Sequence, residues 1–130
     1  MHQQLFGVVE TNLLHILHRR HIAGWLVRQQ LPYQAVRNVA CIAVRHESIG
    51  KGPVLHEVCR AFGITPGEVL VIGDSCNDLS MLDGGFGFAA AVPGNAEDEV
   101  KARVKAIGGY IAQDGYGDGV AEAVRRGFGT

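Results

Sequence analysis

The feature that most constrains the fold is the run Glu68-Val69-Leu70-Val71-Ile72, which is apolar after its first residue and leads into Gly73-Asp74. An unbroken run of this kind is typical of a strand covered on both faces, as in a parallel sheet. Parallel strands cannot be joined by tight turns, so helical crossovers must connect them. The run therefore predicts a chain in which strands and helices alternate.

The sequence from residue 50 onward has this alternation. Gly50-Lys51-Gly52-Pro53 is expected to open a helix that Gly63 closes, because proline suits the first turn and glycine the end. The expected elements after the strand at 68–72 are a short helix at 77–82, a strand at 86–92, a helix capped by Asn95, a strand at 110–112 and a helix at 119–126. This order predicts an α/β fold, a Rossmann-like parallel sheet with flanking helices and right-handed crossovers.

The pattern before residue 50 is less regular. Apolar residues at helical spacing predict a helix from about residue 10 to residue 20, and Gly24 and Pro32 interrupt the pattern beyond it. The segment Asn38–Arg45 is short, apolar and β-branched, which predicts a strand. We therefore place a boundary near residue 50.

Charge and cysteine content exclude several classes of protein. Lys and Arg number 12 and Asp and Glu 13, so the net charge is -1. We therefore expect no clustered positive surface that would bind nucleic acid or an anionic membrane. No apolar run approaches the roughly 20 residues that cross a bilayer, and the first residues do not resemble a secretory signal. Three cysteines without a CxxC pair disfavour a disulfide framework or a zinc site and favour the cytoplasm.

The loop Gly73-Asp74-Ser75-Cys76-Asn77-Asp78 is the first candidate site. It places two carboxylates, an amide and a hydroxyl at the carboxyl end of a buried strand, where parallel sheets bind ligands. Such oxygens suit Mg²⁺, with Asp74 as the more rigidly aimed ligand and Asp78 completing or supporting the shell. The alternative is that both aspartates only cap the following helix.

Lys51 is the second candidate. It lies between two glycines at a predicted helix N-terminus, where an ammonium group and backbone N–H groups would converge on an anion such as phosphate. Taken alone, this lysine is better explained as a solvated side chain in a turn.

Together these features resemble the haloacid dehalogenase superfamily, in particular its Cof-type and sucrose-phosphatase-like phosphatases. Gly50-Lys51-Gly52 and the stretch 69–82 resemble the third and fourth motifs of the family. Pro93-Gly94-Asn95-Ala96 resembles its Gly-Asn-Ala turn, and Asp118–Ala123 its terminal helix. The resemblance runs from about residue 45 to residue 128 in the order and spacing of the family.

The resemblance implies a Mg²⁺-dependent phosphohydrolase that works through an aspartyl-phosphate intermediate. By position, Asp74 would bind the metal and Asp78 would support it. Lys51 would neutralise the phosphate and the attacking carboxylate, and Asn77 would contact the phosphoryl group. The implied partners are phosphorylated small molecules, either sugar phosphates or small phosphorylated acids.

Part of the family pattern has no counterpart in this sequence. The family takes its nucleophile and general acid from an Asp-x-Asp pair, which occurs nowhere in the 130 residues. We therefore expect residues 1–49 to be a remnant of the cap domain with its return strand, and residues 50–130 the C-terminal half of the catalytic core. Such a chain would lack turnover and would leave an apolar sheet edge that invites self-association or takes up the segment Val39–Val44.

Two other functions remain open at this point. One is a non-catalytic module that binds Mg²⁺ or phosphate or regulates a relative. The other is a receiver-like signalling domain, which would need a phospho-accepting aspartate on an earlier strand.

Overall fold

The computed structural model describes residues 8–38 and 41–129 and divides into two compact units, Met1–Ile49 and Gly50–Thr130. The division falls at the boundary expected from the sequence. That the first unit is a remnant of a cap domain stays a prediction.

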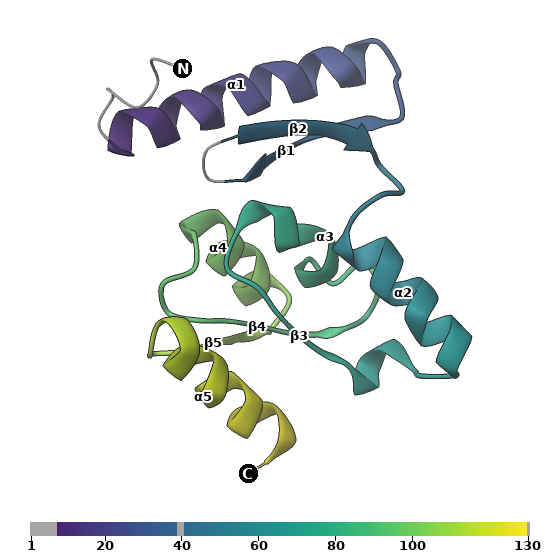
Figure 1. Cartoon of the computed structure of the whole chain (residues 1–130), viewed down its shortest axis with the longest axis vertical. Helices are drawn as coiled ribbons and strands as arrows, with labels where there is room; N and C mark the ends of the chain where they lie inside the picture. Colours follow the sequence, from purple (N-terminus) through teal and green to yellow (C-terminus); the bar gives the residue numbers. More distant parts are fainter. Residues whose placement is uncertain (1–7, 39–40, 130) are drawn as a thin grey trace. The chain divides into compact units, whose positions relative to one another are not determined.

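The first unit is a helix packed on a hairpin (Figure 1). Helix α1 spans Val8–Arg28, and strands β1 (Tyr33–Asn38) and β2 (Cys41–His46) pair antiparallel with Tyr33 opposite His46. The helix is longer than expected because it continues through Gly24, which a helix interior tolerates at about 1 kcal/mol. The expected strand at 38–45 is wrong at its start, because Asn38 ends β1 and only Cys41 begins β2.

The second unit is an α/β fold with a parallel sheet in the order β3-β4-β5. The strands are β3 (Leu70–Ile72), β4 (Ala89–Val92) and β5 (Tyr110–Ile111), and the helices are α2 (Lys51–Phe62), α3 (Leu79–Leu82), α4 (Asp98–Ala106) and α5 (Tyr116–Phe128). Helices α3 and α4 lie on one side of this sheet and α5 on the other (Figure 1). The predicted fold class is thereby confirmed.

The core of this unit lies between the sheet and helices α2, α3 and α4. Leu82, Val92, Val100 and Val104 are its largest fully buried side chains. They come from α3, β4 and α4, so burial of one apolar stripe per helix holds each helix on the strands.

Several expected elements begin later than the sequence indicated, β3 and α3 by two residues each. Strand β4 starts at Ala89 instead of residue 86, because Gly84 and Gly87 adopt φ angles of 84° and 83° and turn the chain before it. Asn95 does not cap α4, since this helix begins at Asp98 without a side-chain cap. The amide oxygen of Asn95 instead accepts a hydrogen bond from the backbone N–H of Tyr116, at 2.5 Å.

Strand β3 is an edge of the three-stranded sheet in the part of the chain that the structure describes. Strand β2 pairs with β1 in the two-stranded sheet of the first unit. Filling of the β3 edge by Val39–Val44 stays a prediction, and Val39 and Ala40 lie outside the described residues. Self-association through β3 stays a prediction. Among the described residues no helix has the length and apolar character needed to cross a membrane.

Helix α2 approaches α3 at Gly52, where only glycine fits. A Cβ atom on Gly52 would lie 2.1 Å from the backbone oxygen of Ser80, whereas one on Gly67 would have no neighbour within 4 Å. We predict that Gly52→Ala lowers the free energy of unfolding by about 1–3 kcal/mol. Chemical denaturation of both variants checks this, with Gly67→Ala as the matched control. Equal stabilities for the two variants would contradict the packing described.

Candidate functional site

The predicted site residues meet in a pocket at the carboxyl ends of β3 and β4. Its volume is about 460 Å³. Each strand or the loop after it contributes to the wall, and α2 contributes its first residue. The lining residues are Lys51, Ile72, Gly73, Asp74, Asp78, Pro93, Asn95, Tyr116, Gly117 and Val120. The position agrees with the rule that parallel sheets bind ligands at this edge.

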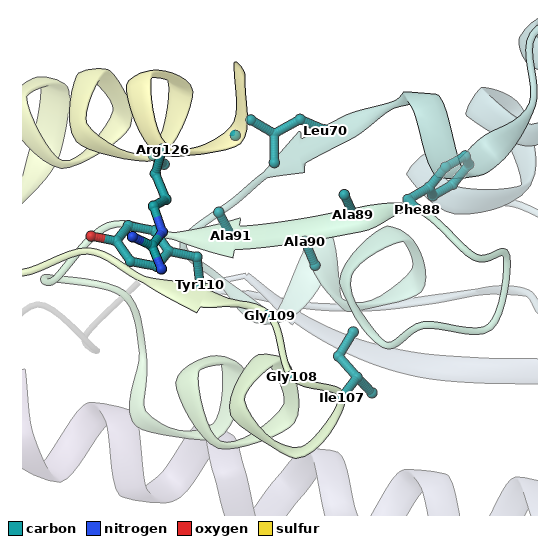
Figure 2. A pocket seen from close by; sticks show the side chains of 12 residues that line it. Leu70, Phe88, Ala89, Ala90, Ala91, Ile107, Gly108, Gly109, Tyr110 and Arg126 are labelled. Carbon is teal, nitrogen blue, oxygen red and sulfur yellow. The ribbon is translucent and has the colours of Figure 1, made fainter. Parts of the chain in front are cut away.

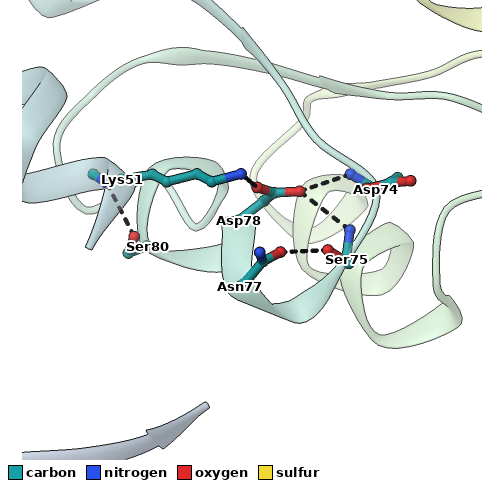
Figure 3. Close-up of polar contacts among 7 residues, drawn as sticks. Lys51, Asp74, Ser75, Asn77, Asp78 and Ser80 are labelled. Atoms are coloured by element: carbon teal, nitrogen blue, oxygen red, sulfur yellow. Dashed lines mark hydrogen bonds and ion pairs between the residues drawn. The ribbon is translucent and has the colours of Figure 1, made fainter. Parts of the chain in front are cut away.

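Asp78 is the central charged group of this pocket (Figure 3). Asp78 is 3% exposed. One of its carboxylate oxygens accepts hydrogen bonds from the backbone N–H groups of Asp74 (3.0 Å) and Ser75 (3.3 Å). The other oxygen forms an ion pair with the ammonium group of Lys51. Since a buried carboxylate is costly unless it is paired and hydrogen-bonded, these three donors explain how Asp78 is accommodated.

Lys51 reaches this carboxylate from the first residue of α2. The neighbouring N–H of Gly52 donates to the hydroxyl of Ser80 at 3.0 Å, which anchors the start of the helix (Figure 3). The side chain of Lys51 is 53% exposed, so the ammonium group contacts both Asp78 and the open pocket. Lys51 is therefore more than a solvated lysine in a turn.

The carboxylate of Asp74 lines the pocket, while its backbone is fixed on both sides. Its N–H donates to Asp78 and its carbonyl oxygen accepts from the N–H of Glu97 at 2.9 Å. No hydrogen bond or ion pair to its carboxylate comes from the part of the chain that the structure describes. Asp74 thus has an exposed carboxylate on a backbone that is held on both sides.

The carboxylates of Asp74 and Asp78 suit a metal ion that takes few ligands from the protein. No group of three or more His, Cys, Asp or Glu side chains that would enclose a metal occurs among the described residues. Asp78 is already occupied by Lys51 and two backbone N–H groups, which leaves Asp74 as the available carboxylate. Mg²⁺ is commonly held by one or two carboxylates together with water and substrate phosphate, so the residues fit such an ion.

Asn77 is placed differently from the other predicted residues. It is not among the residues that line the pocket, and its amide oxygen accepts a hydrogen bond from the hydroxyl of Ser75 (Figure 3). Its expected contact with a phosphoryl group stays a prediction. The hydrogen bond identifies a role in shaping the turn that carries Asp74.

Cys76 is not suited to nucleophilic chemistry. Its sulfur lies 3.1 Å from Glu97 Oε2 and 3.4 Å from Glu99 Oε2. Burial, followed by the hydrogen bond and charge of Glu97, raises the pKa of its thiol to about 12. The reactive form of cysteine is the thiolate, so this environment disfavours reaction.

Two residues of the pocket, Asn95 and Tyr116, were not recognised as site residues from the sequence. They join the loops after β4 and β5, because the amide of Tyr116 donates to the side chain of Asn95. Glu122 of α5 fixes the same region by accepting from the N–H groups of Gln113 and Asp114, each at 3.0 Å. The hydroxyl of Tyr110 also donates to Glu122, at 2.6 Å. The sequence signals for this region were the two family-like segments that contain Asn95 and Glu122 and the glycine-rich turn at 114–119, which the resemblance places near the rim of the family's active site.

A second cavity of about 260 Å³ lies near the amino ends of the strands (Figure 2). Its wall includes Leu70, Ala89 and Tyr110, the first residues of β3, β4 and β5. Arg126 is the one charged side chain among the described residues that line it, and its guanidinium stacks on Tyr110 at 5.5 Å from the ring centroid. This apolar cavity lacks the paired charges of the first pocket.

Comparison with known proteins identifies the family. The family profile described as haloacid dehalogenase-like hydrolase matches residues 35–124. The chain belongs to this family of haloacid dehalogenase-like hydrolases. A phosphoglycolate phosphatase of Methanoculleus marisnigri is 32% identical over 96 residues, which is 74% of this chain and 38% of that protein.

Solved structures of haloacid dehalogenase-like proteins agree in fold. The sucrose-phosphatase of Synechocystis, solved with sucrose and phosphate, matches 84% of this chain and 46% of that chain with a TM-score of 0.73 and 19% identity. A subclass IIB sugar phosphatase of the superfamily matches 75% of this chain and 35% of that chain with a TM-score of 0.61 and 27% identity. The chain thus spans less than half the length of these relatives, and the predicted resemblance is confirmed.

The Glu122 contacts of this haloacid dehalogenase-like chain predict a pH dependence. The hydroxyl of Tyr110 and the N–H groups of Asp114 and Gln113 lower the pKa of Glu122 below its ordinary value of 4.5. This carboxylate therefore stabilises the fold above pH 4.5, and its contribution is lost as the pH falls through the lowered pKa.

We predict that Glu122→Gln is less stable than the unchanged chain near neutral pH and loses less stability on acidification. Thermal unfolding across this pH range checks the prediction. Glu57→Gln is the control, because Glu57 forms an exposed surface pair with Arg60 at 3.6 Å. Identical pH profiles for Glu122→Gln and Glu57→Gln would contradict the assigned role.

Proposed function

We propose that residues 50–130 supply the phosphate-holding and metal-holding side of the active site of a phosphomonoester hydrolase. The observation that supports this is the presence of the Lys51 ammonium group and the Asp74 carboxylate in one pocket. Phosphoryl transfer depends on positioning the phosphate and stabilising its negative charge. A cationic side chain and a carboxylate that can hold a metal ion are the groups that do this.

In this proposal each residue has a separate task. Lys51 binds the phosphate oxygens, and Asp78 holds Lys51 in position while fixing the backbone of Asp74. Asp74 is the residue that would hold Mg²⁺, which when bound polarises the phosphoryl group and offsets its negative charge. Asn77 remains the proposed contact of the phosphoryl group from the turn beside it.

The attacking carboxylate must come from outside this sequence. The resemblance assigns that role to an Asp-x-Asp pair, and the 130 residues contain none. Binding is thus proposed for this chain alone, and turnover only when a polypeptide with the missing pair completes the site. Without such a polypeptide the chain would act as a non-catalytic module that binds Mg²⁺ and phosphate.

The proposed ligands are phosphorylated small molecules. The relatives compared with this chain are a phosphoglycolate phosphatase and two sugar phosphatases, one of them solved with sucrose and phosphate. Both classes share a phosphate monoester, the group that Lys51 and Asp74 are placed to bind. A cytoplasmic location, proposed from the cysteine content, suits such metabolites.

Calorimetric titration with inorganic phosphate tests the binding site. We predict Mg²⁺-dependent phosphate binding that Lys51→Met weakens by about tenfold or more, because the ammonium group is lost. Asp74→Asn is expected to remove the dependence on Mg²⁺, because a neutral amide is a poor ligand for this ion.

Lys101→Met is the matched control, since Lys101 lies on α4 and not in the pocket. This variant should bind phosphate like the unchanged chain. Phosphate binding that is unaffected by Lys51→Met, or equally weakened by Lys101→Met, would contradict the proposed function.

A further inference from the structure

Tyr116 has an unusual backbone. It is the first residue of α5 and adopts a φ angle of 52°, in the left-handed region that bulky residues avoid. Its neighbours on both sides are glycines, Gly115 and Gly117, yet the left-handed conformation falls on the tyrosine. A tyrosine in this conformation is destabilising and persists only where the surroundings enforce it.

The surroundings do enforce it. Asn95 accepts the N–H of Tyr116 at 2.5 Å, and its side chain lies so close to Gly115 that a Cβ there would be 3.3 Å from the amide oxygen. Glu122 holds the preceding residues through Asp114 and Gln113. The conformation is thus fixed by loops from two strands and by α5 itself.

The side chain of Tyr116 is not used to stabilise the core. Tyr116 is 77% exposed, yet it lines the pocket with Val120, which lies one helical turn further along α5. An aromatic ring and a valine at this spacing form a continuous apolar surface. The strained conformation therefore presents a large side chain to the pocket and not to the interior.

The pocket has two chemically different groups of residues. Lys51, Asp74 and Asp78 carry its charges and are joined through Asp78. The other residues that line the pocket carry no charged side chain. They are Ile72, Gly73, Pro93, Asn95, Tyr116, Gly117 and Val120. An anion at the charged group would extend its organic part toward an uncharged surface.

Resting on the proposed function, we propose that Tyr116 selects the leaving group of the substrate, and that this group is an uncharged hydroxylated compound such as a sugar. The face of an aromatic ring packs well against the C–H groups of a sugar, while the amide of Asn95 and the phenol offer hydrogen bonds. A second carboxylate on the ligand would find no side-chain cation among these residues. The positive end of α5 is partly offset by Asp118 in its first turn.

The test compares ligands that share one phosphate group. Inorganic phosphate, glucose 6-phosphate and phosphoglycolate are titrated into the unchanged chain with Mg²⁺. We expect glucose 6-phosphate to bind about five to ten times more tightly than inorganic phosphate, because one stacked ring adds about 1 kcal/mol. Phosphoglycolate is expected to show no such advantage.

Tyr116→Gly removes the ring and relieves the backbone, so the variant should melt at the same or a higher temperature. It should bind inorganic phosphate normally and lose the preference for glucose 6-phosphate. Tyr116→Phe should retain most of that preference. Phe62→Ala is the control, because Phe62 is 76% exposed on α2 and does not line the pocket.

The outcomes separate the two proposals. Normal phosphate binding without a preference for glucose 6-phosphate, or a preference that survives Tyr116→Gly, would overturn the role of Tyr116 and leave the phosphate site intact. Absence of phosphate binding in the unchanged chain would overturn the proposed function and this inference with it.

Discussion

The pocket depends on the way in which the carboxylate of Asp78 is bound. Two backbone N–H groups and the half-exposed ammonium group of Lys51 share the oxygens of this buried carboxylate, which would be costly to bury without such partners. The contact also requires Gly73, because a Cβ atom there would lie 2.5 Å from Cβ of Asp78. One side chain therefore joins the start of α2 to the loop after β3 and holds the backbone of Asp74.

Much of this arrangement could be predicted from local sequence. The apolar run before Gly73 identified β3, and the rule for parallel sheets then placed Asp74 at a ligand-binding edge. The opening of α2 at Lys51 followed from the flanking glycines and Pro53. These predictions succeeded because each depends on residues close together in the chain.

The rest depends on contacts between distant residues. Asn95 is a residue type that often caps helices. Its amide oxygen instead accepts a hydrogen bond from the backbone N–H of Tyr116, more than twenty positions later in the chain. From the sequence alone Glu122 is indistinguishable from a surface residue of α5. Its role depends on the backbone N–H groups of Gln113 and Asp114, which donate to its carboxylate. Strand β1 was missed because half of its six residues are polar and they do not alternate regularly with the apolar ones, so that pairing with β2 decides its structure. Such choices are decided by tertiary structure, which local patterns do not report.

Holding a phosphate and attacking it are separate tasks in this family. Membership of the haloacid dehalogenase-like hydrolases is shown, whereas activity belongs to a site and not to a fold. Among the described residues, a cation, one available carboxylate and an uncharged surface around Tyr116 line one pocket. In the proposed function, turnover would need an attacking carboxylate supplied by another polypeptide.

Paramagnetic broadening of amide signals by Mn²⁺, used in place of Mg²⁺, is the sharpest test of the metal-holding role of Asp74. We predict that substoichiometric Mn²⁺ broadens the amides of Asp74 and Ser75 first, spares Gly108 and Gly109 of the second cavity, and has little effect on Asp74→Asn. Broadening centred on the acidic start of α4, at Asp98 and Glu99, and unchanged by Asp74→Asn would contradict a metal site in this pocket.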